Sequence, residues 1–160
     1  MNTLYTLGYS GLKPEDLGAL AEGHDLVILD IRCSPRSRNP VWTKKRLAER
    51  LGERYVHLRA LGNTDYKGDT IRIADLEAGI REAAAYLERQ SVVLLCACKD
   101  VRSCHRLPVA ERLAAETGAP LVHLSLADAA RMAAEVSGSP VQASLFDEAP
   151  PGDLSPDREA

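Results

Sequence analysis

The segment from Val92 to Arg106, VVLLCACKDVRSCHR, constrains the fold of this chain more than any other. It opens with a short apolar run, which predicts a strand buried on both faces. It closes with Cys104-His105-Arg106, directly before the amphipathic pattern ERLAAE, which predicts a polar loop and then a helix. Ligands of open α/β sheets bind outside the carboxyl ends of parallel strands, so we expect a functional site at this loop.

The rest of the chain alternates apolar runs with segments of helical spacing. Apolar runs predict further strands at residues 3–9, 26–31, 55–58 and 121–124. Helical spacing is found at residues 14–23, 43–51, 73–89 and 125–136, and in a segment that ends near residue 117. The helix that ends near residue 117 begins either with Ser103 as its N-cap or later, with Pro108 as its first residue (N1). This alternation predicts an α/β fold: a single three-layer domain with a mainly parallel sheet covered by helices.

Composition separates the end of the chain from this domain. Residues 137–160 are rich in Pro, Ser and Gly and hold five acids against one Arg. Such a segment has too little apolar surface to form a core. We therefore expect an α/β domain over residues 1–136 and a disordered acidic tail over residues 137–160.

Basic residues concentrate in one part of the predicted domain. Residues 32–59 contain nine Arg or Lys residues against two acids, although the whole chain has a net charge of −3. A basic segment of this kind favours an anionic partner such as DNA or a nucleotide. The candidate nucleic-acid contacts are Arg38, Trp42, Lys44, Lys45 and Arg46, with Trp42 able to stack on a base. The alternative is a solvated helix face with Trp42 packed on the domain.

The N-terminal sequence MNTLYTLGYS has no basic start followed by an apolar core, and no apolar run approaches the length of a membrane span. We expect a cytoplasmic protein with no membrane partner. Its four cysteines would then be reduced, as catalytic, metal-binding or buried thiols.

Several motifs resemble those of a bacterial and archaeal family catalogued as domain of unknown function 488. They are TLGYS at 6–10, LDIR at 29–32 with PRS at 35–37, YVHLRALG at 55–62, and LLC at 94–96 with CHR at 104–106. Two positions depart from the family pattern: Tyr9, where His is usual, and Cys98, where an acid is more frequent. The resemblance implies a compact α/β domain and no established reaction.

Cys104 is the candidate nucleophile. A thiolate at the start of a helix, near Arg102 and Arg106, would be stabilised by the helix dipole and by the cations. His105 and Asp30 would complete the catalytic set as a base and an orienting carboxylate. The alternative is a buried thiol that packs as a small apolar residue, with Arg106 in a structural ion pair.

Polar side chains at the same strand ends are candidates for binding an anion. Arg32 could hold a phosphate bidentately, or form a structural ion pair with Asp30. The predicted ligand-binding residues are Arg32, Arg36, Arg106, Lys99, Tyr9, Ser10 and His57.

Two further interpretations of the cysteines stay open. A zinc site could use Cys96, Cys98, Cys104 and His105, with Cys33 as a further candidate ligand. Its spacing differs from paired CxxC units, and we predict no metal and no cofactor. Cys96 and Arg102 also fit Cys-x5-Arg, the loop of tyrosine phosphatases and rhodaneses.

The tail contains the sequence QASLF at residues 142–146, with the only Phe of the chain. It is similar to the peptide by which bacterial replication and repair proteins bind the DNA sliding clamp. An apolar pair on a flexible tether can anchor in a groove. We predict that Gln142, Leu145 and Phe146 bind the clamp, the alternative being that the apolar pair packs on its own domain.

Three functions follow from these observations. The first is a bacterial DNA-transaction protein, in repair or replication, that binds a phosphate-bearing or nucleic-acid ligand at the Cys-His-Arg crevice and docks on the clamp. The second is a small-molecule enzyme with a cysteine nucleophile, a phosphatase or a sulfurtransferase. The third is a non-catalytic nucleic-acid-binding module.

Overall fold

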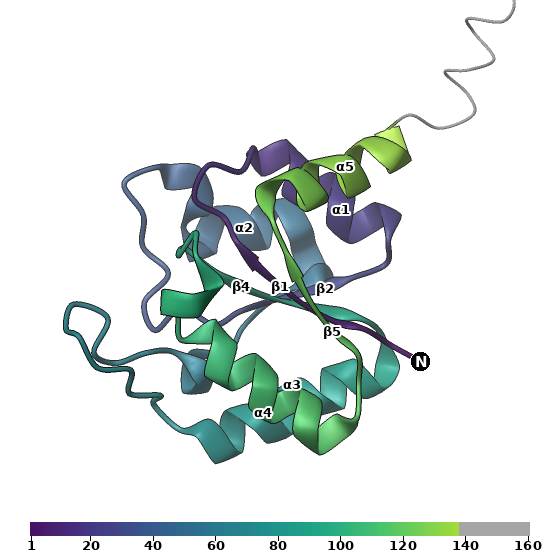
Figure 1. Cartoon of the computed structure of the whole chain (residues 1–160). Helices are drawn as coiled ribbons and strands as arrows, with labels where there is room; N and C mark the ends of the chain where they lie inside the picture. Colours follow the sequence, from purple (N-terminus) through teal and green to yellow (C-terminus); the bar gives the residue numbers. More distant parts are fainter. Residues whose placement is uncertain (138–160) are drawn as a thin grey trace, which may run out of the picture.

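Figure 1 shows the computed structural model of the chain, which describes residues 1–137. Its strands are β1 (Leu4–Gly8), β2 (Val27–Asp30), β3 (Tyr55–His57), β4 (Val92–Cys96) and β5 (Leu121–Leu124). Within this part of the chain they form one parallel sheet in the order β3-β2-β4-β1-β5, so β4 is its central strand. The predicted α/β fold is confirmed.

Helices cover both faces of the sheet (Figure 1). The α1 (Pro14–Gly23), α2 (Lys44–Leu51) and α5 (Leu126–Ser137) helices lie on one face, and α1 and α5 pack against each other. The α3 (Leu76–Arg89) and α4 (Arg106–Thr117) helices lie on the other. Short 3-10 turns connect these elements: η1 (Pro40–Trp42), η2 (Gly52–Arg54), η3 (Arg59–Leu61) and η4 (Val101–Ser103).

The central strand is apolar throughout because each of its faces meets a hydrophobic core. Val92, Leu94 and Cys96 pack in the core under α3 and α4. Val93 and Leu95 pack in the opposite core, with α1 and α2. Successive side chains of a strand point to opposite faces, so a strand between two helical layers needs apolar residues at every position. All five residues of β4 are buried.

Two helices begin at residues other than those that the sequence pattern predicts. The α3 helix starts at Leu76 rather than at residue 73, because the Asp75 side chain accepts a hydrogen bond from the Ala78 N–H at 3.2 Å and caps it. The α4 helix starts at Arg106, so neither proposed start was right. Ser103 lies in the preceding turn η4, and Pro108 is the third residue of the helix.

The final helix is capped as predicted, by Ser125, whose hydroxyl accepts a hydrogen bond from the Asp128 N–H at 3.0 Å. That helix extends to Ser137, and the rest of the predicted tail lies outside the described residues. No helix in residues 1–137 is both long enough and apolar enough to cross a membrane.

Candidate functional site

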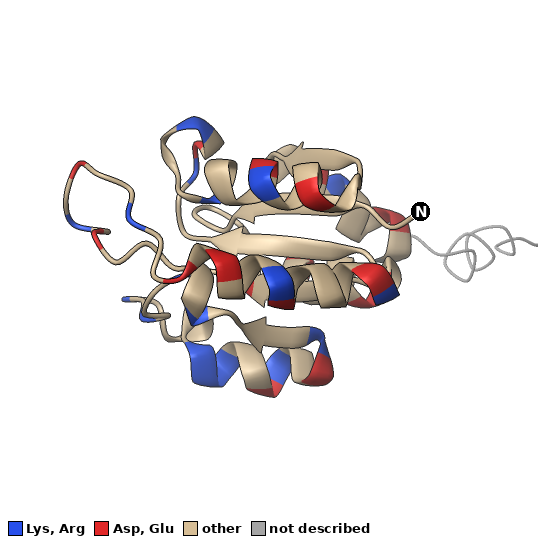
Figure 2. Ribbon diagram, turned by 90° about the horizontal axis from the view of Figure 1, so that it is seen from below, with Lys and Arg blue, Asp and Glu red and all other residues tan. Residues whose placement is uncertain are grey.

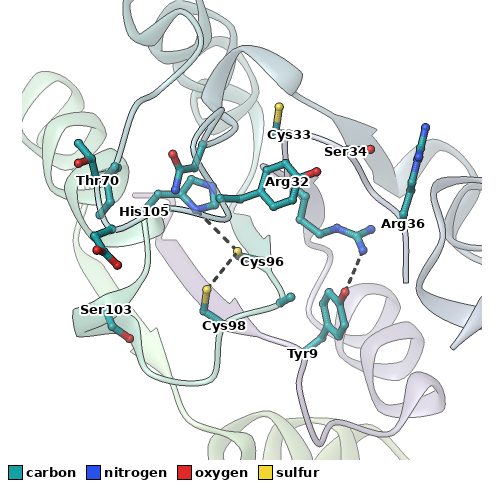
Figure 3. Close-up of a pocket in the computed structure, with 16 residues that line it drawn as sticks. Tyr9, Arg32, Cys33, Ser34, Arg36, Thr70, Cys96, Cys98, Ser103 and His105 are labelled. Atoms are coloured by element: carbon teal, nitrogen blue, oxygen red, sulfur yellow. Dashed lines mark hydrogen bonds between the residues drawn. The ribbon is translucent and has the colours of Figure 1, made fainter. Parts of the chain in front are cut away.

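The carboxyl ends of β1, β2 and β4 open into a cavity of about 650 Å³. The helices that follow β1 and β2 lie on one face of the sheet, whereas α4, which follows β4, lies on the other (Figure 1). Such a divergence of the chain is where open α/β sheets form ligand crevices. The lining residues, shown in Figure 3, are Tyr9, Arg32, Cys33, Ser34, Arg36, Asn63, Tyr66, Gly68, Asp69, Thr70, Ile71, Cys96, Ala97, Cys98, Ser103 and His105.

Asp30 ends β2 and is fully buried beneath this cavity. Arg32 donates to both of its carboxylate oxygens, at 2.8 Å and 2.6 Å, in a bidentate pair. The Tyr55 hydroxyl donates a third hydrogen bond to Asp30, at 2.6 Å. The hydrogen bonds of Asp30 within residues 1–137 therefore go to Arg32 and Tyr55, and not to His105 or Arg106 as one interpretation expected.

The buried ion pair of Asp30 and Arg32 shifts the pKa values of Arg32 and Tyr55. Burial alone would lower the pKa of Arg32, but the hydrogen bonds and charge of Asp30 outweigh burial, and the pKa is raised. Burial raises the pKa of Tyr55, and the neighbouring Asp30 carboxylate raises it further. Asp30, Arg32 and Tyr55 thus form a network in which the charge of Arg32 is already matched inside the protein.

Tyr9 connects this network to the cavity wall. Its hydroxyl accepts a hydrogen bond from Arg32 at 3.0 Å (Figure 3). Its ring stacks on Trp42, with 4.4 Å between ring centroids. Trp42 is only 4% exposed and belongs to the core beside α1 and α2. A base cannot stack on a side chain this buried, so Trp42 is not part of the nucleic-acid interface proposed below.

A sulfur-rich cluster lies at the end of β4. The Nδ1 atom of His105 is 3.8 Å from the Cys96 sulfur and 3.8 Å from the Cys104 sulfur. The Cys98 sulfur lies 3.9 Å from that of Cys96. The ligand atoms of Cys96, Cys104 and His105 all lie within 4.8 Å of one another, and these three residues are buried. On the far side of the ring, His105 Nε2 is 2.8 Å from the carbonyl oxygen of Ile31.

The three thiols of this cluster share hydrogen bonds. Hydrogen bonds from the thiols of Cys96 and Cys98 favour the charged form of Cys104, which lowers the pKa of Cys104. The same hydrogen bonds raise the pKa of Cys96 to about 11 and also raise the pKa of Cys98. Cys104 itself is only 1% exposed and does not line the cavity. Its role as a nucleophile stays a prediction, and its burial favours a ligand or packing role.

Arg106 holds the loop that follows β4. Its guanidinium is 2% exposed and donates to the carbonyl oxygen of Cys98 at 2.7 Å and to that of Lys99 at 3.5 Å. Gly8 of β1 lies against the same loop, and a Cβ atom at Gly8 would overlap the Cys98 carbonyl oxygen. The loop therefore needs glycine at this position.

The other predicted ligand-binding residues divide between the cavity wall and its surroundings. Arg36 lines the cavity, whereas Ser10, His57 and Lys99 do not. The Ser10 hydroxyl donates to the Ala97 carbonyl at 2.5 Å, and His57 Nε2 donates to the Arg32 carbonyl at 2.8 Å. Both contacts fix the backbone around the cavity.

The Cys-x5-Arg pattern does not bring its two residues together at the cavity. The Arg102 side chain is 85% exposed and pairs with Asp100 at 3.5 Å. Cys96 lines the cavity, and Arg102 does not.

Sequence reasoning missed Tyr55 and the wall formed by residues 63–71. Tyr55 gives no signal beyond being a tyrosine at the start of a predicted strand. Residues 63–71 had the Gly, Asn and Asp content of a loop, and the position of that loop at the cavity has no signature in the sequence.

An exposed basic surface extends from the cavity onto α2. It consists of the exposed residues Arg36, Arg38, Lys44, Lys45 and Arg46. The Lys44 N–H donates to the Pro35 carbonyl at 3.2 Å, which joins the start of α2 to the loop that carries Arg36. Figure 2 shows the resulting run of basic residues on the helix at its lower edge. None of the five forms an ion pair within residues 1–137.

Comparison with protein families gives one match. The family described as domain of unknown function DUF488 matches residues 16–113. The chain belongs to this family. The DUF488 match extends from α1 into α4 and so contains Asp30, Arg32 and the whole sulfur-rich cluster, while Tyr9 precedes it. No curated protein and no solved structure matches the chain significantly.

Proposed function

We propose that this protein is a bacterial, cytoplasmic DNA-transaction protein whose α/β domain binds a phosphate-bearing ligand, nucleic acid in particular. The observation that carries this proposal is the basic surface: five exposed cations, none in an ion pair within residues 1–137, next to a cavity at the carboxyl edge of the sheet. When unpaired Lys and Arg side chains neutralise the phosphates of a nucleic acid, the counterions that surround the nucleic acid are released. This release is the main source of affinity for nucleic acid.

The arrangement of the cations assigns different roles to the arginines. Arg32 is buried and its charge is matched by Asp30, so it shapes the cavity wall. Arg36 lines the cavity and is exposed, so it is the cation best placed for a phosphate that enters there. Lys44, Lys45 and Arg46 on α2 would then contact the adjoining backbone phosphates.

A salt titration tests this proposal. Fluorescence anisotropy with a labelled single strand and with its duplex gives the binding constant over a range of salt concentrations. The variant Lys44→Ala/Lys45→Ala/Arg46→Ala should bind more weakly. Its log–log salt slope should be smaller by about 2 to 3, since each lost phosphate contact contributes roughly 0.7 to 0.9.

The matched control is Lys13→Ala/Arg81→Ala/Arg131→Ala, which removes the same charge from exposed positions elsewhere in the molecule. It should keep most of the salt slope. Equal losses in the two variants would show that net charge alone drives binding and would contradict a defined interface. Absence of binding by the wild-type protein at low salt would overturn the proposal.

The second part of the proposal is docking on the DNA sliding clamp by Gln142, Leu145 and Phe146, which lie outside the described residues. The sequence QASLF in an acidic, proline-rich segment supports it. Burying Leu and Phe contributes about 1.5–3 kcal/mol each, part of which ordering of the segment offsets. A peptide of residues 140–148 should therefore bind a bacterial clamp with an affinity on the order of micromolar.

Isothermal titration calorimetry with the purified clamp measures this affinity, and the Leu145→Ala/Phe146→Ala peptide is the control that should not bind. Equal heats for the two peptides, or none for either, would contradict docking. Clamp binding also separates a DNA-transaction protein from a nucleic-acid-binding module without this partner.

One observation favours the alternative of a cysteine-nucleophile enzyme, a phosphatase or sulfurtransferase. Cys96, Cys98 and His105 line the cavity, so a small substrate there would meet sulfur and imidazole together.

A further inference from the structure

At the end of β4, the possible metal ligands of Cys96, Cys104 and His105 lie within 4.8 Å of one another, and the Cys98 sulfur lies 3.9 Å from that of Cys96. We propose that Cys96, Cys98, Cys104 and His105 bind one Zn²⁺ ion, contrary to the expectation from the sequence. The proposal is independent of nucleic-acid binding. It rests on the distances within the cluster, on the hydrogen bond of His105 and on the charge of Arg106.

The distances among Cys96, Cys104 and His105 fit zinc, and the Cys98 side chain would have to move towards them to complete the tetrahedron. With Zn–S bonds of about 2.3 Å and Zn–N bonds of about 2.0 Å, tetrahedral ligands lie about 3.8 Å apart for two sulfurs and about 3.6 Å apart for sulfur and nitrogen. The cluster has 3.9 Å between the Cys96 and Cys98 sulfurs and 3.8 Å from His105 Nδ1 to the sulfurs of Cys96 and Cys104. Thiolate and imidazole ligands select zinc over magnesium or calcium.

His105 is oriented as a metal ligand. Its Nε2 lies 2.8 Å from the Ile31 carbonyl oxygen, which can only accept, so Nε2 carries the proton. In the neutral ring the lone pair is then on Nδ1, which faces the sulfurs of Cys96 and Cys104. A backbone carbonyl on the far side of the ring is the usual means of fixing a metal-binding histidine.

The surroundings supply the opposite charge. Arg106 is buried, and within residues 1–137 its Nε atom has no hydrogen-bond partner. Its other guanidinium hydrogen bonds go to carbonyl oxygens, and Asp100 acts on it through its charge alone. A buried cation needs a nearby negative charge. Zn²⁺ with three thiolates carries a charge of −1, which would match Arg106. The Arg106 backbone N–H also lies 3.5 Å from the Cys104 sulfur, where it stabilises a thiolate.

Four protein ligands make this a closed, structural site. Cys98 is half-buried on the cavity wall, and its carbonyl is held by Arg106. Zinc would join the end of β4, the loop after it and the start of α4, so it would fix one wall of the cavity. On binding, each cysteine thiol releases its proton to the solvent as its sulfur bonds to the metal.

Metal titration of the full-length protein tests the proposal. The reduced protein, stripped with a chelator, is titrated with Zn²⁺ in competition with a chromophoric chelator, and separately with Co²⁺ while its absorption spectrum is recorded. We expect one ion per chain, with Co²⁺ giving the visible bands of tetrahedral coordination and sulfur-to-cobalt charge transfer.

The variants Cys104→Ser and Cys98→Ser test the ligands, and Cys33→Ser is the matched control. Cys33 is half-buried and lines the same cavity, but it is not one of the four proposed ligands. Loss of a ligand should weaken zinc binding by about 100-fold or more, since even the partners of ligands contribute 10–100-fold. Cys98→Ser changes a partly exposed side chain, so it keeps the test valid if Cys104→Ser does not fold by circular dichroism.

A wild-type protein that leaves all Zn²⁺ with the chelator would overturn the proposal. So would equal loss of affinity in Cys33→Ser and Cys98→Ser. A Co²⁺ spectrum with octahedral bands and no charge transfer would show that the thiols are not ligands.

Discussion

At the end of β2, the buried Asp30 carboxylate accepts hydrogen bonds from Arg32 and Tyr55, so protein groups match the charge of Arg32. At the end of β4, the next strand of the sheet, contacts of 3.8–3.9 Å join three thiols and an imidazole. Within residues 1–137, the hydrogen bonds of the buried Arg106 guanidinium go to carbonyl oxygens, and Asp100 acts on it through its charge alone. In the proposed zinc complex the thiolates would bind the metal, and the net charge of −1 would lie beside Arg106. The first cluster is balanced by protein groups alone, whereas we propose that the second one binds a metal ion.

The largest effect is expected from breaking the first cluster. Asp30→Ala leaves Arg32 buried and unpaired, so the free energy of unfolding should fall by about 3–5 kcal/mol. The double variant Asp30→Leu/Arg32→Met should lose less than Asp30→Ala, because no buried charge remains. Urea unfolding followed by circular dichroism measures both. A smaller loss in Asp30→Ala than in the double variant would mean that the pair is not self-sufficient.

The next largest effect concerns the sulfur-rich cluster at the end of β4 and the zinc ion that we propose it binds. Zn²⁺ at about 100 times its dissociation constant should raise the free energy of unfolding by about 3 kcal/mol, since a ligand of the native state stabilises in proportion to the logarithm of its concentration. Urea unfolding with Zn²⁺ and with a chelator gives the difference. Cys104→Ser should lose this stabilisation and Cys33→Ser should keep it. Stabilisation of Cys104→Ser by Zn²⁺ would place the metal elsewhere.

A smaller effect concerns Tyr55 and has a pH dependence. Tyr55→Phe removes one hydrogen bond to a buried carboxylate and should cost about 1.5 kcal/mol at neutral pH. The pKa of Tyr55 is raised in the folded state, so the folded protein retains this proton while the unfolded chain releases it near pH 10. The stabilisation that Tyr55 provides is therefore complete below about pH 10, and it declines as the pH rises above that value.

The advantage of the wild type over Tyr55→Phe should therefore shrink above about pH 10. Urea unfolding of both proteins across this range measures it, and the difference cancels the titration of groups that they share. A constant difference would show that Tyr55 does not titrate with unfolding.

The sequence was sufficient to predict the helices and strands and the edge of the sheet at which the cavity lies. The apolar run at Val92 predicts a strand between two helical layers, and the polar residues after it must then lie at the carboxyl edge. It was not sufficient to predict which side chains of neighbouring strands contact one another at that edge. Tyr55 reaches Asp30 because β3 pairs with β2 in the register that places Ile28 beside Tyr55, and a register between strands this far apart in the chain has no local signal.

The lack of a local signal for contacts between distant parts of the chain also explains why the sequence did not predict the surroundings of Trp42 and Cys96. An aromatic residue in a basic segment fits either a base or the core, and only the packing of η1 on Tyr9 decides for the core. The alternation within β4 predicts that Cys96 faces one layer but not which one. The structure directs it towards α4, where Cys104 and His105 lie, and this brings together possible metal ligands whose spacing along the chain did not predict a metal site.

The smallest effect is expected at Arg102, and it tests the enzyme alternative. In a Cys-x5-Arg loop the arginine holds the substrate anion, so its loss would abolish binding of phosphate or of vanadate, a phosphate analogue. Here Arg102 lies outside the cavity and pairs with Asp100 at the surface. Arg102→Ala should therefore leave the Tm and anion binding unchanged, whereas Arg36→Ala should weaken anion binding, because Arg36 is exposed on the cavity wall. Calorimetric titration of both variants with phosphate and with vanadate makes the comparison. If Arg102→Ala lost the anion and Arg36→Ala kept it, the loop after β4 would close over the substrate as in a phosphatase. Cys96 would then be a nucleophile rather than a zinc ligand.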